Sequence, residues 1–246
     1  MIPLRDVNPT RVAPILTVLI IALNIGAFVF FQQRGADEET EFLYENAAIA
    51  CELISGDPLT VAEVQQNICN DDAGAQIFPD KSIALSAVVS MFLHGGWLHL
   101  LSNMWFLWIF GNNVEEAFGS IGFLLLYAVA GIAATAGFVA VNASSTVPLV
   151  GASGAIAGIL GAYLVLFPTH RILTLIILLV FPLVIGVPAI IFLGLWFVGQ
   201  FSLADPNVAV EAHIVGFAVG VVVAMLMRGR LLRRVKTLEN ASLRRF

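Results

Sequence analysis

Long apolar runs constrain this chain more than any other feature of its sequence. A helix needs about 20 predominantly apolar residues to cross a hydrocarbon core about 30 Å thick. Several runs meet or approach that length and contain almost no charged residue. We therefore expect membrane spans at about 12–31, 95–111, 119–141, 152–167, 187–202 and 210–227.

The composition supports lipid as the solvent. Of the 246 residues, 59% are hydrophobic and only 12% are charged, against about 25% charged in soluble domains. The predicted fold class is therefore an all-α polytopic membrane protein with six transmembrane helices. The first run is too long for a cleavable signal and lacks a small-residue cleavage site, so we expect it to stay as an anchor.

Two apolar stretches fit this pattern less well. The segment 83–94 is short, and we expect it to lead into the second span at the membrane surface. The segment 172–186 is interrupted by Pro182 and Gly186 and is followed by Pro188. We interpret it as an irregular connection, with a re-entrant pair or an extra helix as the alternatives.

Basic residues predict the orientation, because Lys and Arg accumulate on the cytoplasmic side. Arg5 and Arg11 precede the first span, and the segment 228–246 after the last span is strongly basic. Both termini are then cytoplasmic, as an even number of spans requires. The chain divides into a segment with the first span (1–31), an acidic external loop (32–82), a core of five further spans (83–227) and the basic tail (228–246). The net charge of −5 comes mostly from the external loop, so it does not indicate nucleic acid or nucleotide partners.

The only two cysteines, Cys51 and Cys69, lie in the external loop. An external disulfide is compatible with that location, and free thiols are the alternative. The sequence has neither a His-Glu-x-x-His motif nor a cysteine pair at zinc-ligand spacing. We expect no metal and no cofactor.

A few polar residues stand inside the predicted spans, where ionisable side chains are costly and often functional. His99 and Asn103 begin the second span, Ser153 begins the fourth and His213 begins the sixth. These three spans all run from outside to inside, so we expect the four side chains to converge below the outer face.

Glycine spacing brings two of these helices together. Gly154 and Gly158 form a smooth strip on the fourth span, while Gly216 and Gly220 share a face with His213 on the sixth. Such strips allow close backbone approach, which would place His213 beside Ser153. Close packing alone is the alternative explanation for a serine between small residues, but packing does not require a histidine on the partner helix.

These residue types suit acyl transfer. A serine hydroxyl becomes nucleophilic when a base such as histidine takes its proton, and the developing oxyanion needs hydrogen-bond donors. His99, Asn103 and the backbone N–H of Ser153 can donate; interhelical hydrogen bonding is the alternative role for the two side chains. The only acids near the sixth span are Asp205 and Glu211, so we expect a Ser–His dyad, with the histidine oriented by packing and by an aromatic such as Tyr163.

The motifs resemble those of the rhomboid family of intramembrane serine proteases. The fourth span has Gly151-Ala-Ser153-Gly154, and the sixth has Ala-His213-x-x-Gly216-x-x-x-Gly220. The second has His99-x-x-x-Asn103, with His94 upstream in MFLHGGWLHLLSNM. The Trp-Arg pair that many rhomboids carry in the first external loop is absent, and the 32–82 loop is less compact than is usual in the family.

The resemblance implies an endopeptidase that cleaves transmembrane protein substrates near the external membrane face through an acyl-enzyme. Ser153 would be the nucleophile and His213 the general base, with His99, Asn103 and the Ser153 amide as the oxyanion hole. The fifth span and the loop near 203–208 would resemble the family's gate and cap. His94, Gly151, Gly154, Gly216 and Gly220 would support this site.

Two other functions compete with this interpretation. A catalytically silent protein of the same fold would bind transmembrane clients, but such relatives normally lack the serine or the histidine. A transporter or channel would have polar residues along a path to the cytoplasmic face, whereas here they stop near the outer side. We expect the lipid bilayer and transmembrane proteins as partners, and a prokaryotic plasma membrane as the location.

Overall fold

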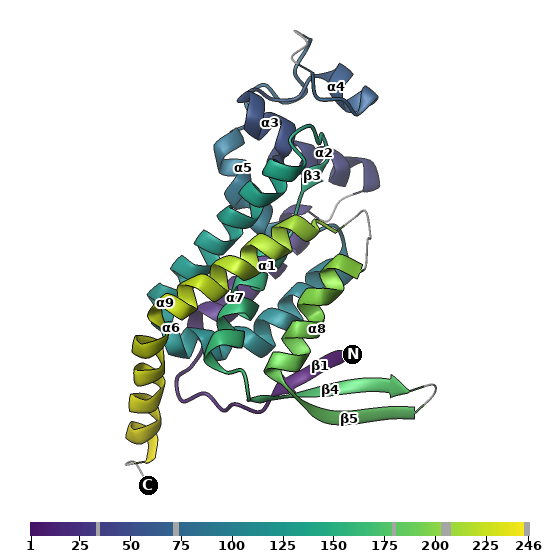
Figure 1. The fold of residues 1–246 in the computed structure, drawn as a ribbon. Helices are drawn as coiled ribbons and strands as arrows, with labels where there is room; N and C mark the ends of the chain where they lie inside the picture. The colour runs from purple at the N-terminus through teal and green to yellow at the C-terminus, as the bar shows by residue number, and fades with distance from the viewer. Residues whose placement is uncertain (33–34, 71–73, 179–180, 203–207, 244–246) are drawn as a thin grey trace.

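The computed structural model describes residues 1–32, 35–70, 74–178, 181–202 and 208–243. Its main body is a bundle of apolar helices (Figure 1). These helices are α1 (Ile15–Ala27) with the π-helical turn η1 (Phe28–Gln32), α6 (Trp97–Val141), α7 (Ser153–Leu166), α8 (Ala189–Ser202) and α9 (Val210–Leu243).

Among the described residues, three helices are long and apolar enough to cross a membrane: Ile15–Gln32, Trp97–Val141 and Val210–Leu243. Shorter apolar helices cover Ile83–Phe92, Ser153–Leu166 and Ala189–Phe201. The chain is therefore a mostly helical membrane protein. Six spans and two cytoplasmic termini stay predictions.

Helix α6 contains both the second and the third expected span. Its backbone leaves the helical conformation at Gly119, where φ is 72° and ψ is 160°. Left-handed φ values favour glycine, and a methyl group here would also lie 3.3 Å from the Arg234 guanidinium. Gly119 therefore separates two helical segments within α6.

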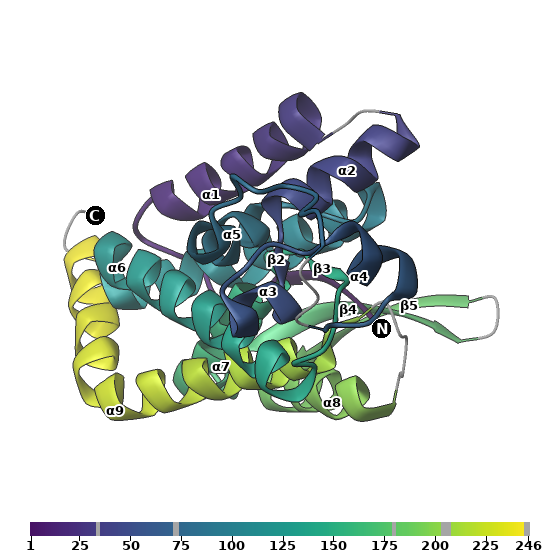
Figure 2. The same ribbon diagram turned by 90° about the horizontal axis from the view of Figure 1, so that it is seen from above.

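Helix α7 is the centre of the bundle, and 11 of its 14 residues are buried. It packs between α6 and α9, as both views show (Figures 1 and 2). The fit against α9 is close, because a methyl group at Gly216 would overlap the carbonyl oxygen of Gly154, and one at Gly220 would overlap that of Gly158. The two glycine strips thus meet as the sequence predicts.

An antiparallel sheet lies at the lower end in Figure 1, in the order β1 (Ile2–Asp6), β4 (Arg171–Leu178) and β5 (Phe181–Pro188). The expected irregular connection at 172–186 is therefore wrong, because this stretch belongs to a regular β-hairpin. Pro182 and Pro188 belong to β5, which is an edge strand, and proline is tolerated there because it lacks only an N–H that need not pair.

The opposite end carries the short elements of the predicted external loop, above the bundle in Figure 1. They are α2 (Ala36–Asn46), β2 (Ala48–Ile49), α3 (Ala50–Ser55) and α4 (Val61–Gln66). They are followed by α5 (Ile83–Val89) and the short helix η2 (Ser90–Phe92). We call the described residues from 36 to 82 the outer module.

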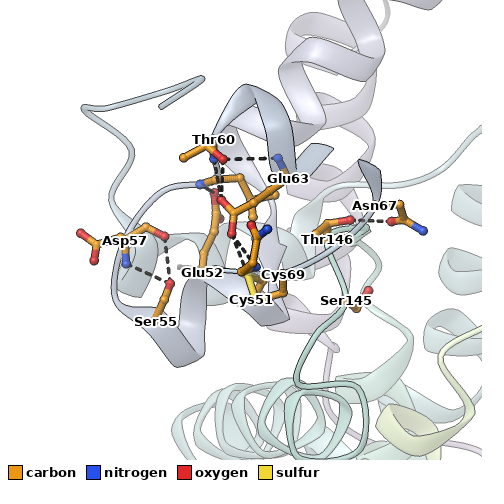
Figure 3. The surroundings of a disulfide bond; sticks show 12 residues. Cys51, Glu52, Ser55, Asp57, Thr60, Glu63, Asn67, Cys69, Ser145 and Thr146 are labelled. Carbon is orange, nitrogen blue, oxygen red and sulfur yellow. Dashed lines mark hydrogen bonds between the residues drawn. A yellow bond between two sulfur atoms is a disulfide. The ribbon is translucent and has the colours of Figure 1, made fainter. Parts of the chain in front are cut away.

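The outer module has a small core of its own, in which Cys51 and Cys69 form a disulfide with an S–S distance of 2.06 Å (Figure 3). Next to it, the Lys81 ammonium forms a buried ion pair with Glu52 at 2.5 Å. Burial lowers the pKa of Lys81, and the pairing with Glu52 opposes that shift.

The basic tail continues α9 without interruption to Leu243. Arg234 donates to the carbonyl oxygen of Glu116 at 3.0 Å. Arg11, from the segment before α1, bridges Glu116 and Glu239 at 3.4 and 3.3 Å. The tail is thus attached to the N-terminal segment and to the turn of α6.

Candidate active site

Ser153 is the first residue of α7, and the segment before it has an unusual backbone. Gly151 has a φ of +127°, and its N–H donates to the carbonyl oxygen of Ser90 at 2.9 Å. Just upstream, β3 (Pro148–Leu149) pairs with β2 of the outer module. The start of α7 is therefore held by two neighbouring segments.

The His99 ring and the Ser153 hydroxyl both lie beside Gly151. A methyl group at Gly151 would be 2.9 Å from Cε1 and Nε2 of His99, and 3.4 Å from Oγ of Ser153. Only glycine leaves room for both groups at this point. The structure therefore brings two of the sequence-predicted residues together across a single glycine.

Hydrogen bonding orients the His99 ring. The N–H of Gly95 donates to Nδ1 of His99 at 3.2 Å. Because Nδ1 accepts, the proton of the neutral ring lies on Nε2, and Nε2 is one of the atoms beside Gly151. His99 thus presents an N–H donor toward the start of α7.

Asn103 follows His99 by one helical turn and is 7% exposed. Its side-chain Nδ2 is buried without a hydrogen-bond partner among the described residues. A buried donor without a partner is costly in a resting protein. It is therefore available to a group that enters the site.

His94 supports the His99 ring. The two rings meet edge to face with centroids 5.1 Å apart, and Phe28 of η1 also packs edge-on against His94 at 6.5 Å. The backbone of His94 is held by the Gln32 side chain, which accepts from its N–H at 2.9 Å and donates to its carbonyl oxygen. Gln32 was not among the predicted residues, because it stands at the end of a span, where polar residues are ordinary.

His213 lies on the α9 face that packs against α7. The carbonyl oxygen of its neighbour Ala212 would be 3.7 Å from a methyl group at Gly154, the residue after Ser153. His213 is only partly buried and its Nδ1 lies 2.7 Å from Oε1 of Gln200 on α8. The Trp196 ring lies 6.2 Å from the His213 ring.

Tyr163, which we expected to orient His213, lies at the opposite end of α7 from Ser153. Its hydroxyl donates to Asp6 of β1 at 3.0 Å, close to the sheet. Trp196 and Gln200 occupy the position beside His213 instead. Gln200 is a polar residue within a predicted span, so the criterion that selected the histidines could have found it. Asp205 and most of the predicted cap, 203–207, lie outside the described residues.

One group could resemble a metal site. Ligand atoms of Cys51, Glu63 and Cys69 lie within 4.8 Å of one another. Both thiols are used in the disulfide, however, so neither can act as a thiolate ligand. This group is therefore a structural part of the outer module (Figure 3).

The described arrangement contains the parts that acyl transfer requires. It has a hydroxyl at a helix N-terminus, an imidazole on the adjoining helix, an N–H donor on His99 and an unpaired amide donor on Asn103. Acyl transfer uses groups of these types as its nucleophile, its base and its oxyanion donors.

Comparison with known proteins identifies relatives of the chain. The Rhomboid domain profile matches residues 83–230. The chain is 32% identical over 158 residues to Rhomboid protease GluP of Bacillus subtilis, covering 64% of this chain and 26% of that protein. It is 34% identical over 143 residues to Rhomboid protein 1, mitochondrial, of Saccharomyces cerevisiae, covering 56% of this chain and 40% of that protein. It is 43% identical over 72 residues to Rhomboid-like protein 11, chloroplastic, of Arabidopsis thaliana, covering 29% of this chain and 25% of that protein. The chain thus spans less than half the length of each of these relatives.

Proposed function

This chain belongs to the rhomboid family, and from that premise we propose that it is an intramembrane serine endopeptidase acting on transmembrane proteins. Its apolar helices and its family make it an integral membrane protein. Family membership supports peptide hydrolysis in general, and the roles of single residues are our proposal.

In this proposal Ser153 is the nucleophile and His213 is the general base. His99 Nε2, Asn103 Nδ2 and the backbone N–H of Ser153 stabilise the oxyanion. Gly151, Gly154, Gly216 and Gly220 provide the close approaches that the site needs, and His94 supports the His99 ring.

The contact between α7 and α9 carries the proposal. Gly216 leaves no room for a methyl group against Gly154, and the Ala212 carbonyl oxygen would lie 3.7 Å from a methyl group at Gly154. His213 immediately follows Ala212 and stands one turn before Gly216, while Ser153 immediately precedes Gly154. This packing supports a pairing of Ser153 with His213.

The reaction would proceed in two steps. The Ser153 oxygen attacks the peptide carbonyl carbon while His213 accepts the hydroxyl proton, and the oxyanion receives hydrogen bonds. When the C–N bond breaks, His213 gives the proton to the leaving amine. Water then attacks the acyl carbon while His213 takes one of its protons. When the acyl C–O bond breaks, His213 returns that proton to the Ser153 oxygen, and the second product leaves as a carboxylic acid.

Water and an extended substrate segment are both required. Hydrocarbon contains no water, so the site must open to the face where the helices begin, beside the outer module. A helical substrate must unwind locally, because its hydrogen bonds occupy the carbonyl oxygens. The proposed substrates are therefore single transmembrane helices with small or helix-breaking residues near their outer end.

We propose a prokaryotic plasma membrane as the location. The relatives include proteins named as mitochondrial and chloroplastic, so fractionation of the native cells is the direct measurement. The expected result is enrichment with the plasma membrane.

Reconstituted activity tests the function. Purified protein in liposomes is incubated with single-span reporter proteins, and cleavage is compared for wild type, Ser153→Ala and His213→Ala. We expect both variants to lose cleavage while their thermal melting is retained. A fluorophosphonate probe should label wild type but not Ser153→Ala.

Two outcomes contradict the proposal in different ways. Cleavage that persists in Ser153→Ala excludes this serine as the nucleophile. Wild type that neither cleaves any reporter nor reacts with the probe favours a catalytically silent, client-binding relative.

A further inference from the structure

We propose that Gln200 of α8 is a positioning residue that fixes the tautomer of His213, so that Nε2 is the proton-accepting atom. This inference deepens the proposed function and rests on it. It gives the dyad a third, uncharged member from a different helix.

The contact itself is short and direct. Nδ1 of His213 and Oε1 of Gln200 are 2.7 Å apart, within the range of a well-formed hydrogen bond. Both residues are only partly exposed, so the bond is sheltered from competition by bulk water. It links α8 to α9 at the level of the candidate site.

The orientation of the Gln200 amide follows from its other contact. Its Nε2 donates to the carbonyl oxygen of Trp196 at 3.2 Å, one turn earlier in α8. Reversing the amide would place two acceptor oxygens against each other at Trp196 and lose that hydrogen bond. The amide oxygen therefore faces His213.

An amide oxygen can only accept, so Nδ1 of His213 must carry the proton. In a neutral imidazole the other nitrogen, Nε2, then has the free lone pair. A general base needs this lone pair, and the wrong tautomer would present an N–H to the serine instead. Gln200 thus performs the orienting part of the task that a carboxylate performs in a catalytic triad, without a charge.

No other described group performs this task. Helix α8 contains no Asp, Glu, His, Lys or Arg, and the only ionisable residue of α7 is Tyr163 at its far end. The ionisable groups whose charges act on His213 are His99 of α6 and Glu211 of its own helix. The hydrogen bond of Nδ1 is made with neither of them.

The first test reads the tautomer without using activity. The chain has only four histidines, so ¹⁵N-histidine labelling of the wild type and of Gln200→Leu gives a simple spectrum, with His213→Ala to assign the signal. Protonated and unprotonated ring nitrogens resonate far apart. We expect a single Nδ1–H form in the wild type and a tautomer mixture in Gln200→Leu.

The second test uses kinetics on the same proteins. Gln200→Leu should lower kcat about tenfold with KM unchanged, the effect of one neutral hydrogen bond. Gln200→Glu should keep most of the activity, and its carboxylate should move the acid limb of the kcat–pH profile up by about one pH unit, because it favours the imidazolium. Thr135→Val is the control, since Thr135 is a buried polar residue whose hydroxyl donates to the Gly131 carbonyl oxygen of its own helix.

The outcomes are separable from those of the proposed function. If the wild type cleaves no reporter, the function fails, but the nitrogen spectrum still decides the tautomer. An Nε2–H form in the wild type, or a Gln200→Leu variant with unchanged spectrum and kcat, overturns the role of Gln200. A fall in melting temperature with unchanged spectrum and pH profile also overturns it, because it shows a structural role only.

Discussion

At the scale of single residues, Gly151 is the position of the candidate site that tolerates substitution least. Its φ of +127° and its closeness to His99 and Ser153 both require glycine. We expect Gly151→Ala to reduce cleavage at least about 100-fold, because displacing an oxyanion donor costs that much. Cleavage and probe labelling measure the effect. Gly56→Ala is the matched control: it also has a positive φ, of +83°, but nothing lies within 4 Å.

Asn103 allows activity and stability to be separated. Its Nδ2 has no partner among the described residues, so Asn103→Ala removes no resting hydrogen bond of that atom. We expect kcat to fall about 100- to 1000-fold while the melting temperature falls little. A large loss of stability with a small loss of kcat would instead assign Asn103 to bundle packing.

The sequence identifies the candidate site residues because polar side chains are rare in apolar spans. Ser153, His213, His99 and Asn103 stand out for that reason alone. Gln200 meets the same criterion, but its contact with His213 depends on how α8 is rotated against α9, and periodicity in one helix does not contain that information. The partner of Tyr163 could not be predicted either, since Asp6 lies 157 residues away in sequence.

At the scale of elements, Asp6 connects the sheet to the bundle. Burial raises its pKa from 3.8 to about 6, although the Tyr163 hydrogen bond opposes the shift. Its contribution to stability is therefore complete below the unfolded pKa and is lost as pH rises through about 6. Asp6→Asn keeps an acceptor for Tyr163 but cannot ionise.

We expect Asp6→Asn to gain stability relative to wild type between about pH 4.5 and 7.5. Because Asp6 is only partly buried and is therefore partly screened by water, the gain should be about 1 kcal/mol. Melting curves at both pH values measure it. A difference between variant and wild type that stays constant across this range would contradict the prediction.

The disulfide holds the outer module, and the outer module holds the segment before Ser153. Thr146 donates to Asn67 at 2.5 Å, and Cys51 N–H donates to the Ser145 carbonyl at 3.0 Å. The cysteines are 18 residues apart, and closing a loop of that size stabilises a fold by about 3 kcal/mol.

We therefore expect Cys51→Ser/Cys69→Ser to increase proteolytic nicking of the outer module and to slow substrate cleavage. Dithiothreitol should reproduce both effects in the wild type and have none on the double variant. An equal response of both proteins to the reductant would show that the disulfide is not the cause.

The sheet is the part of the fold that the sequence patterns do not predict. The helices α7 and α8 begin within two residues of the predicted spans 152–167 and 187–202. The apolar stretch 172–186 does not identify itself as two strands, because short apolar strands and helix fragments have the same composition. Pro182 and Pro188 argue against a central strand but are compatible with an edge strand, and which strand lies at the edge is known only once the sheet is assembled.

At the scale of the whole molecule, the outer module and the α9 tail lie at opposite ends of the bundle (Figure 1). Six spans require five crossings between them. In a Cys51→Ser/Cys69→Ser background, we expect Asp57→Cys to react with an impermeant maleimide in intact cells. Ala241→Cys should react only after permeabilisation. Labelling of both from one side would mean an even number of crossings and would overturn the six-span topology.

The pairing of β2 with β3 sets an order of events during synthesis. Ala48 and Leu149 are register partners, so a ribosome makes the first strand about 100 residues before the second. Contacts this distant in sequence form late. The strand β3, just before Ser153, can pair with β2 only after both helical segments of α6, which lie between the two strands in the chain, have been made. A nascent chain therefore has its outer module well before it has the serine. The nucleophile and the module that holds it can meet only after both segments of α6 have been made, and α8 and α9, which come later in the chain, complete the bundle around them.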